Sequence, residues 1–227
     1  MSEETQTRRP WSRKKKMLVW LVGIIVTVIA LWAGYTVIAE GNLEQPVYEV
    51  VETFDETELR RYAPFIIAST QLKQEGDSSL RSGFRILAGY IFGGNQPRES
   101  MAMTAPVLQQ NEAGESLPMT APVMQSPDDM RMAFVMPGGR SLNDLPTPDD
   151  ESVTLSEVRW GLVAATRFSG WGTQAKFQEA EHLLRETLRT QNLTPRGPAL
   201  YAQYNSPFAF PLLRRNEVLI PLVEDRN

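Results

Sequence analysis

A run of 23 residues without a charged side chain, from Met17 to Ala39, constrains this 227-residue chain more than any other feature. As a helix with a rise of about 1.5 Å per residue, the run is about 35 Å long, enough to cross a hydrocarbon core of about 30 Å. The apolar core of a cleaved signal peptide has only about 7–15 residues. We therefore predict a transmembrane signal anchor over residues 17–39. Cleavage after Val37-Ile38-Ala39 is the alternative.

The charges on the two sides of this run differ in sign. Residues 1–16 carry six basic and two acidic side chains, whereas residues 40–227 carry 17 basic and 25 acidic ones. By the positive-inside rule, residues 1–16 form a cytoplasmic segment that also meets anionic lipid. We expect a linker over residues 40–46 and a domain over residues 47–227 on the exported, periplasmic or extracytoplasmic side. Its acidic balance argues against nucleic acid as a partner.

The residue types that carry much of enzyme chemistry are scarce in this chain. It has no cysteine and a single histidine, His182. This excludes disulfides, thiolate catalysis, zinc–thiolate sites, iron–sulfur clusters and sites built from several histidines. No serine, aspartate or glutamate is paired with a base in a recognisable nucleophile arrangement. We therefore predict a binding domain and not an enzyme, with no catalytic and no metal-ligating residue.

Periodicity predicts an α+β domain with a largely antiparallel sheet. A first helix starts at Asp77 or Ser78, presents Leu80, Phe84, Leu87, Ala88 and Ile91 on one face, and ends at Gly93-Gly94. A second helix is predicted over residues 173–189. The predicted strands are residues 47–54, 62–70, 153–158, 162–168, 200–204 and 217–223, with further short strands between the first helix and residue 150.

His182 and the methionines are the remaining candidates for metal ligands. On a helical wheel, His182 falls on the polar face of the second helix, so we expect it to face water. Met130, Met132, Phe134 and Met136 share one side of a strand, which predicts a core or a cleft wall. The alternative is that Met101-x-Met103 and Met130-x-Met132 form a thioether site for Cu(I).

Five short motifs resemble the SOUL/haem-binding protein family and occur in the family's order. They are Ala102–Val107, whose Met-Thr-Ala-Pro-Val recurs at residues 119–123, then Met132–Pro137, Phe168–Gly170, Tyr204–Pro207 and Arg214–Val218. The resemblance implies a distorted antiparallel β-barrel of two similar halves, flanked by two α-helices. It also implies that haem or a related tetrapyrrole binds in a shallow apolar cleft, with the protein as a non-catalytic carrier or buffer.

The resemblance places the cleft between the first helix and a later loop. Its residues are Leu80, Arg81, Phe84, Arg85, Leu87 and Ala88 of the helix, and Phe208, Phe210, Leu212 and Leu213 of the loop. Arg81 matches a basic position that the family places near the haem propionates, and Arg85 lies one turn further on. Two other basic positions of the family are replaced here, one by Gly89 and one by Ala209 or Phe210. We therefore expect weak haem binding, through apolar burial or with tyrosine or methionine as a weak iron ligand.

Two alternatives to haem binding stay open at this point. The apolar cleft could receive an amphipathic segment of another envelope protein, since exposed apolar patches often mark partner sites. It could also take another apolar small molecule or a lipid. We interpret Arg214-Arg215-Asn216-Glu217 as a structural network with nearby carboxylates.

Overall fold

The computed structural model describes residues 13–40, 43–73, 77–96, 107–110, 130–206 and 208–224, with the backbone alone for residues 107–110 and for Asp77. Both Met-Thr-Ala-Pro-Val segments therefore lie outside the described residues, apart from the backbone of Val107. The same holds for Met101 and Met103, so the proposed thioether pair is not tested.

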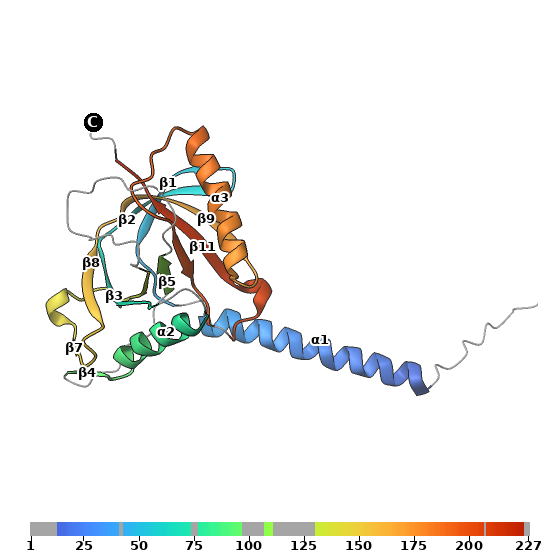
Figure 1. Cartoon of the computed structure of the whole chain (residues 1–227). Coiled ribbons are helices and arrows are strands. Elements are labelled where there is room, and N and C mark those ends of the chain that lie inside the picture. Colours follow the sequence, from blue (N-terminus) through green and yellow to red (C-terminus); the bar gives the residue numbers. More distant parts are fainter. Residues whose placement is uncertain are drawn as a thin grey trace, which may run out of the picture.

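Within the described residues, nine strands form one sheet in which every neighbouring pair is antiparallel (Figure 1). They are β1 (Tyr48–Phe54), β2 (Thr57–Tyr62), β3 (Phe65–Gln71), β5 (Val107–Gln110), β6 (Arg131–Val135), β8 (Thr154–Val158), β9 (Gly161–Ser169), β10 (Leu200–Gln203) and β11 (Arg215–Pro221). The order across the sheet is β1-β2-β9-β11-β10-β5-β6-β3-β8. A separate two-stranded ladder joins β4 (Asn95–Gln96) to β7 (Thr147–Pro148).

The order of elements along the chain shows two similar halves, if the edge strand β1 and the separate β4–β7 ladder are set aside. Each half runs strand, strand, helix, strand, strand: β2, β3, α2, β5 and β6 in the first, and β8, β9, α3, β10 and β11 in the second. The first strand of each half pairs with the second strand of the other half, β2 with β9 and β8 with β3. The two halves also meet where β5 pairs with β10.

The sheet does not close into the barrel that the family resemblance implied, which is a correction. Closure requires the two edge strands to pair. In the described part of the chain, β1 pairs only with β2 and β8 only with β3. The register of β1 shifts between Val50 and Glu52, and its central residues are exposed. This edge is therefore a solvated ribbon and not a closing strand.

Two helices pack on the outside of the curved sheet, as expected. Helix α2 (Asp77–Ile91) lies against β3 and β6, and α3 (Gln174–Thr190) lies against β9 and β11 (Figure 1). Thr173 caps α3 by accepting a hydrogen bond from the backbone N–H of Lys176 at 3.4 Å. Gly93, with φ of +106°, follows α2 in the left-handed conformation that glycine adopts without strain.

Residues of the central strands alternate between different hydrophobic clusters. Val218 and Ile220 of β11 pack with Phe177, Leu184 and Leu188 of α3, whereas Leu219 faces an inner cluster with Val163 and Trp160. On β6, Met132 and Phe134 pack with α2 while Ala133 and Val135 face the inner cluster. This two-residue period is what a strand covered on both faces requires.

Strand β2 was not predicted from the sequence. Its residues include two consecutive arginines, and of these Arg61 is exposed whereas Arg60 is 3% exposed. Leu59 and Tyr62 are buried in clusters on opposite faces of the strand. The strand therefore carries a buried charge in a position where the pattern alone would require an apolar residue.

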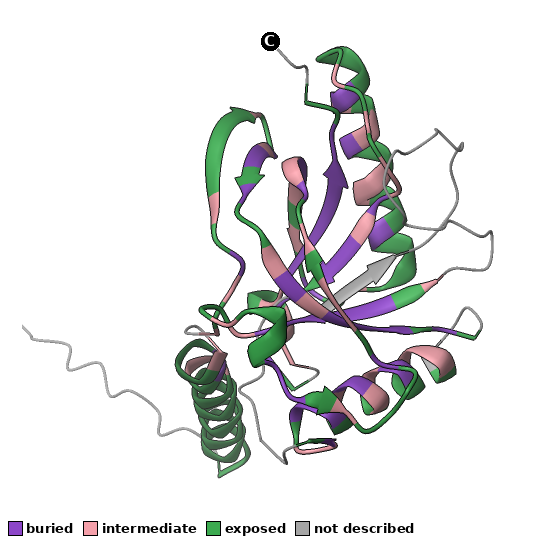
Figure 2. Ribbon diagram, turned by 90° about the vertical axis from the view of Figure 1, so that its left-hand side faces the viewer, coloured by how far each residue is buried: buried purple, intermediate pink, exposed green. Residues whose placement is uncertain are grey.

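Helix α1 (Arg13–Glu40) precedes the domain and contains the whole predicted span. The helix has 28 residues and is long and apolar enough to cross a membrane, and most of its surface is exposed (Figure 2). Length and composition of this kind fit either a membrane anchor or a signal sequence. The exception is the last part of the helix, where Thr36 is 3% exposed.

Candidate functional site

Helix α2 supplies the first group of predicted site residues. Leu87 is completely buried in the cluster that α2 forms with β3 and β6. Leu80, Phe84 and Ala88 are half-buried on one flank of the helix and pack against the same cluster. Leu87 is therefore a core residue in this structure, and only the half-buried flank of α2 is available to a ligand.

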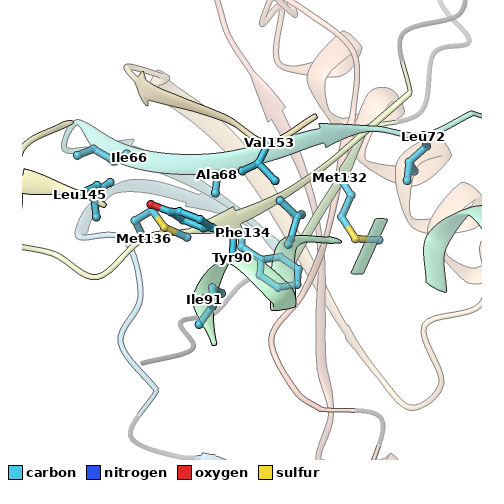
Figure 3. Packing of buried hydrophobic residues seen from close by; sticks show 11 residues of the cluster. Ile66, Ala68, Leu72, Tyr90, Ile91, Met132, Phe134, Met136, Leu145 and Val153 are labelled. Carbon is cyan, nitrogen blue, oxygen red and sulfur yellow. The ribbon is translucent and has the colours of Figure 1, made fainter. Parts of the chain in front are cut away.

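The sulfur atoms near α2 belong to the same core. Met132 and Met136 are buried in this cluster, and Met130 packs against it. In Figure 3, the side chains of Met136, Tyr90 and Phe134 lie close together between the sheet and α2. The expectation that these methionines form a core or a cleft wall is confirmed, since their surroundings are apolar.

The second group lies in residues 208–213, which we call the lip segment. Phe208 is 80% exposed and Leu212 is 71% exposed, whereas Phe210 is half-buried. A 3₁₀ turn, η2 (Pro211–Leu213), begins with a proline and holds the two leucines on the surface. The lip segment therefore presents large apolar side chains to its surroundings.

Helix α1 holds the lip segment in place. The indole N–H of Trp32 donates to the carbonyl oxygen of Phe208 at 2.7 Å, and the N–H of Phe210 donates to Oγ1 of Thr36 at 2.9 Å. The rings of Trp32 and Phe210 meet edge to face, with 5.2 Å between centroids. One turn further on, Glu40 accepts hydrogen bonds from Asn205 and Ser206.

Sequence reasoning did not identify these contact residues of α1. The available signal was the spacing of Trp32, Thr36 and Glu40, which recur every four residues and so share one face of the helix. In a helix that is apolar on all sides, a threonine and a terminal glutamate on the same face indicate that this face contacts the rest of the protein and not lipid.

The end of α1, the lip segment and α2 lie at the same end of the molecule in Figure 1, and α1 and α2 can be followed at that end in Figure 2. Arg81 and Arg85 occupy the exposed side of α2, beside its half-buried flank. Two guanidinium groups one helical turn apart can each pair with a carboxylate. This end of the domain therefore combines apolar surface with two basic side chains, which suits a flat apolar molecule bearing carboxylates.

A strong protein ligand for iron is not found at this end among the described residues. His182 is exposed on α3, as expected, and so belongs to a different face of the molecule. The described part of the chain also holds no group of three or more His, Asp or Glu side chains that could bind a metal ion. Any haem bound here would be held chiefly by apolar contact and by its propionates.

The Arg214–Glu217 motif forms the structural network that was expected. Arg215 Nε donates to Glu217 at 2.8 Å and Tyr204 Oη donates to it at 2.6 Å, while the Asn216 amide donates to the carbonyl of Gly170. Arg60 completes the set around the fully buried Glu217 carboxylate. No pattern in the sequence indicated that Arg60 would take part.

The network shifts the pKa values of its members. Burial acts to raise the pKa of Glu217, but the hydrogen bond and charge of Arg60, the charge of Arg215 and the hydrogen bond from Tyr204 outweigh it, so the pKa lies below its usual value. Burial raises the pKa of Tyr62 to about 12, against the opposing effect of Arg60. These groups stay in one protonation state at neutral pH, which fits a structural role and not proton transfer.

Comparison with known proteins identifies the relatives of this domain. The family model described as SOUL heme-binding protein matches residues 43–221. Heme-binding protein 2 of Mus musculus is 30% identical over 204 residues, covering 83% of this chain and 95% of that protein. Heme-binding protein 2 of Homo sapiens is 30% identical over 163 residues, covering 71% and 75% of the two chains.

Among solved structures, the EcmrR C-terminal domain has the same overall fold. It matches with a TM-score of 0.51 at 9% sequence identity, covering 78% of this chain and 99% of that one. At such low identity the likeness concerns the fold alone.

Proposed function

Because this chain belongs to the SOUL haem-binding family, we propose that it binds haem or a related tetrapyrrole in a shallow apolar cleft between α2 and the lip segment. The observation that carries this proposal is the large exposure of Phe208 and Leu212 in the lip segment, which lies at the same end of the domain as α2 in Figure 1. A porphyrin offers a flat apolar surface that would cover such side chains. The half-buried flank of Phe84 and Ala88 would form the facing wall.

Arg81 and Arg85 would pair with the haem propionates, since both are exposed and lie beside that wall. The iron would have a weak axial ligand or none from the protein, because His182 lies on another face. Haem is then a cargo that the protein holds and releases, as a carrier or buffer, without catalysis.

We also propose that α1 is retained as a membrane anchor, with the basic N-terminal segment in the cytoplasm and the domain on the exported side. Cleavage after Ala39 would remove Trp32 and Thr36, which hold the lip segment through the hydrogen bonds described above. Those contacts favour an uncleaved helix over a signal peptide. The charge difference across the helix favours the stated orientation.

Haemin titration of the full chain in lipid nanodiscs tests the binding proposal. We expect a Soret band that saturates near one haem per chain at micromolar concentration or below, corresponding to about −8 kcal/mol or stronger. Empty nanodiscs measure the uptake of haemin by lipid alone. Uptake that does not saturate, or that matches empty nanodiscs, would contradict haem binding by the protein.

Variants separate the two parts of the proposed cleft. Phe208→Ser with Leu212→Ser should weaken haem binding by loss of apolar contact, and Arg81→Glu with Arg85→Glu should weaken it by repelling the propionates. Arg189→Glu on the exposed side of α3 is the matched charge control and should bind normally. Normal binding by both double variants would place the haem elsewhere.

The exposed apolar side chains of the lip segment also favour a second function, the binding of a segment of another envelope protein. Phe208, Leu212 and Leu213 would then insert into a partner. In that case, crosslinking in the intact membrane from a photoreactive residue at position 212 should give one protein adduct. Haemin titration in nanodiscs should show no saturable binding.

A further inference from the structure

We propose that the lip segment is seated in the interfacial layer of the bilayer that α1 enters, so that the apolar site opens toward lipid. This inference deepens the proposed function and rests on the proposed anchoring of α1. It assigns a lipid surface as the partner of Phe208, Leu212 and Leu213. The ligand would then exchange directly with the membrane and not through the aqueous compartment.

The contacts between α1 and the lip segment fix the height of the lip on the helix. Trp32 binds the backbone of Phe208 and Thr36 binds the backbone of Phe210, so two successive turns of α1 lie against the same short segment. Both hydrogen bonds involve lip backbone groups, which leaves the side chains of Phe208 and Leu212 free to point outward. The level of these turns in the bilayer is therefore the level of the lip.

The length of α1 places those turns at the outer boundary of the hydrocarbon region. A core of about 30 Å takes about 20 helical residues, and 20 residues counted from Met17, directly after the basic segment, end at Thr36. Glu40 then lies about 6 Å further out, at the level of the head groups. A charged residue is acceptable there, and it binds Asn205 and Ser206.

The side chains at this level have the composition of a membrane interface. Trp32 and Tyr35 of α1 are 41% and 64% exposed, and tryptophan and tyrosine are enriched where a helix leaves the bilayer. The lip adds Phe208, Leu212 and Leu213, all exposed. Large apolar side chains are thus exposed both on the end of the helix and on the lip that it contacts.

The charge around the lip also fits a lipid head group. Residues 205–215 contain no acidic side chain and two arginines; Arg215 pairs with the buried Glu217, which leaves Arg214 and the nearby carboxylate of Glu40 as the charges of the lip. The Arg214 guanidinium stacks over the exposed Trp171 ring at 4.1 Å and donates to the carbonyl of Ala209 at 3.0 Å. An arginine whose guanidinium stacks on an aromatic ring keeps its charge there, at the level of the lipid phosphates.

Single-cysteine labelling of the full chain tests this inference, because the protein contains no cysteine of its own. Phe208→Cys and Leu212→Cys would each carry an NBD fluorophore in phosphatidylcholine nanodiscs, with and without nitroxide-labelled lipid. Arg189→Cys is the negative control, since the C-terminal end of α3 points away from α1 in both views. Ile25→Cys, in the middle of α1, is the positive control for insertion of the helix.

We expect nitroxide lipid to quench the labels at positions 25, 208 and 212 at least threefold more than the label at position 189. Quenching at position 25 with positions 208 and 212 behaving like 189 would overturn the seating of the lip. Absence of quenching at position 25 would overturn the anchoring and the inference together. None of these outcomes depends on haem, so failure of the haemin titration with quenching intact would contradict haem binding alone.

Discussion

Arg60 and Glu217, which are 157 positions apart, form a buried ion pair with two hydrogen bonds, from Nη1 to Oε2 at 2.8 Å and from Nη2 to Oε1 at 3.1 Å. Their side chains are 3% and 0% exposed. The pair connects β2, from the beginning of the domain, to β11, its last strand, across β9. A charge buried this deeply is tolerated only because the opposite charge and its hydrogen-bond donors are in place.

The first prediction concerns this ion pair. Arg60→Met should destabilise the domain by about 3–5 kcal/mol, because it leaves the Glu217 carboxylate buried without its main partner. Urea unfolding of the full chain in detergent, followed by tryptophan fluorescence, measures the change. Arg61→Met is the control on the same strand: the Arg61 side chain is 57% exposed and its guanidinium lies 3.6 Å from Glu224, so the cost should be about 0–1 kcal/mol. Equal effects of the two substitutions would refute the special role of Arg60.

The second prediction is a pH dependence. The folded-state pKa of Glu217 lies below its usual value of 4.5, so its contribution to stability is complete above that pH. That contribution is lost as the pH falls below 4.5 through the folded-state pKa, because the unfolded chain then takes up the proton first. The free energy of unfolding should therefore decrease on acidification from pH 5 downward.

Glu217→Gln isolates this effect from that of other carboxylates. Asp144 and Asp150 also have lowered pKa values, through hydrogen bonds from Ser141 and Ser152, and they titrate in both proteins. The stability difference between wild type and the variant should be largest at neutral pH and should shrink below pH 4.5. A difference that is constant with pH would show that Glu217 does not titrate with a lowered pKa.

The third prediction concerns the contact between α1 and the lip segment. Thr36→Val removes the oxygen that accepts the N–H of Phe210, at a cost of about 1 kcal/mol. Amide hydrogen exchange at Phe210 should then accelerate by roughly fivefold, the factor that corresponds to this energy. Thr27→Val is the matched control, since the Thr27 hydroxyl bonds only within the helix, to Gly23. Unchanged exchange in Thr36→Val would mean that the hydrogen bond does not hold the lip.

The fourth prediction separates the two groups of candidate site residues. Leu87→Ala should destabilise the domain by about 2–5 kcal/mol, because Leu87 is completely buried. Leu212→Ala should leave the unfolding free energy within about 0.5 kcal/mol of wild type, because this leucine is 71% exposed, but should weaken haem binding. Parallel urea unfolding and haemin titration distinguish the two. A stable Leu87→Ala variant with impaired haem binding would move Leu87 back into the site.

Much of the fold followed from local patterns. The first helix was predicted to start at Asp77 or Ser78, and α2 begins at Asp77; the second was predicted over 173–189, and α3 spans 174–190. The exposure of His182 and the burial of Met132 were also predicted correctly. These features depend on residues within a few turns of one another, whose periodicity is readable in the sequence.

The features that were not predicted from the sequence have a different cause, because they depend on contacts between distant segments. Strand β2 was overlooked because Arg60 occupies an inward position, and its acceptability depends on Glu217. The barrel was expected to close, but its closure depends on whether β1 and β8 meet, which no strand pattern encodes. For the site, the apolar face of α2 was predicted, whereas the full burial of Leu87 came only from its packing against β3 and β6.

Residue types and local spacing were sufficient to predict the apolar span, the two amphipathic helices and the alternation of the strands, because each of these depends on residues that are close in the sequence. Three features became visible only in the folded chain: the pairing of the first strand of each half with the other half, the ion pair of Arg60 with Glu217, and the contact of Trp32 with Phe208. The physical reason is that a hydrogen bond or ion pair depends on which segments meet. The periodicity of a sequence carries no information about contacts between residues more than 150 positions apart.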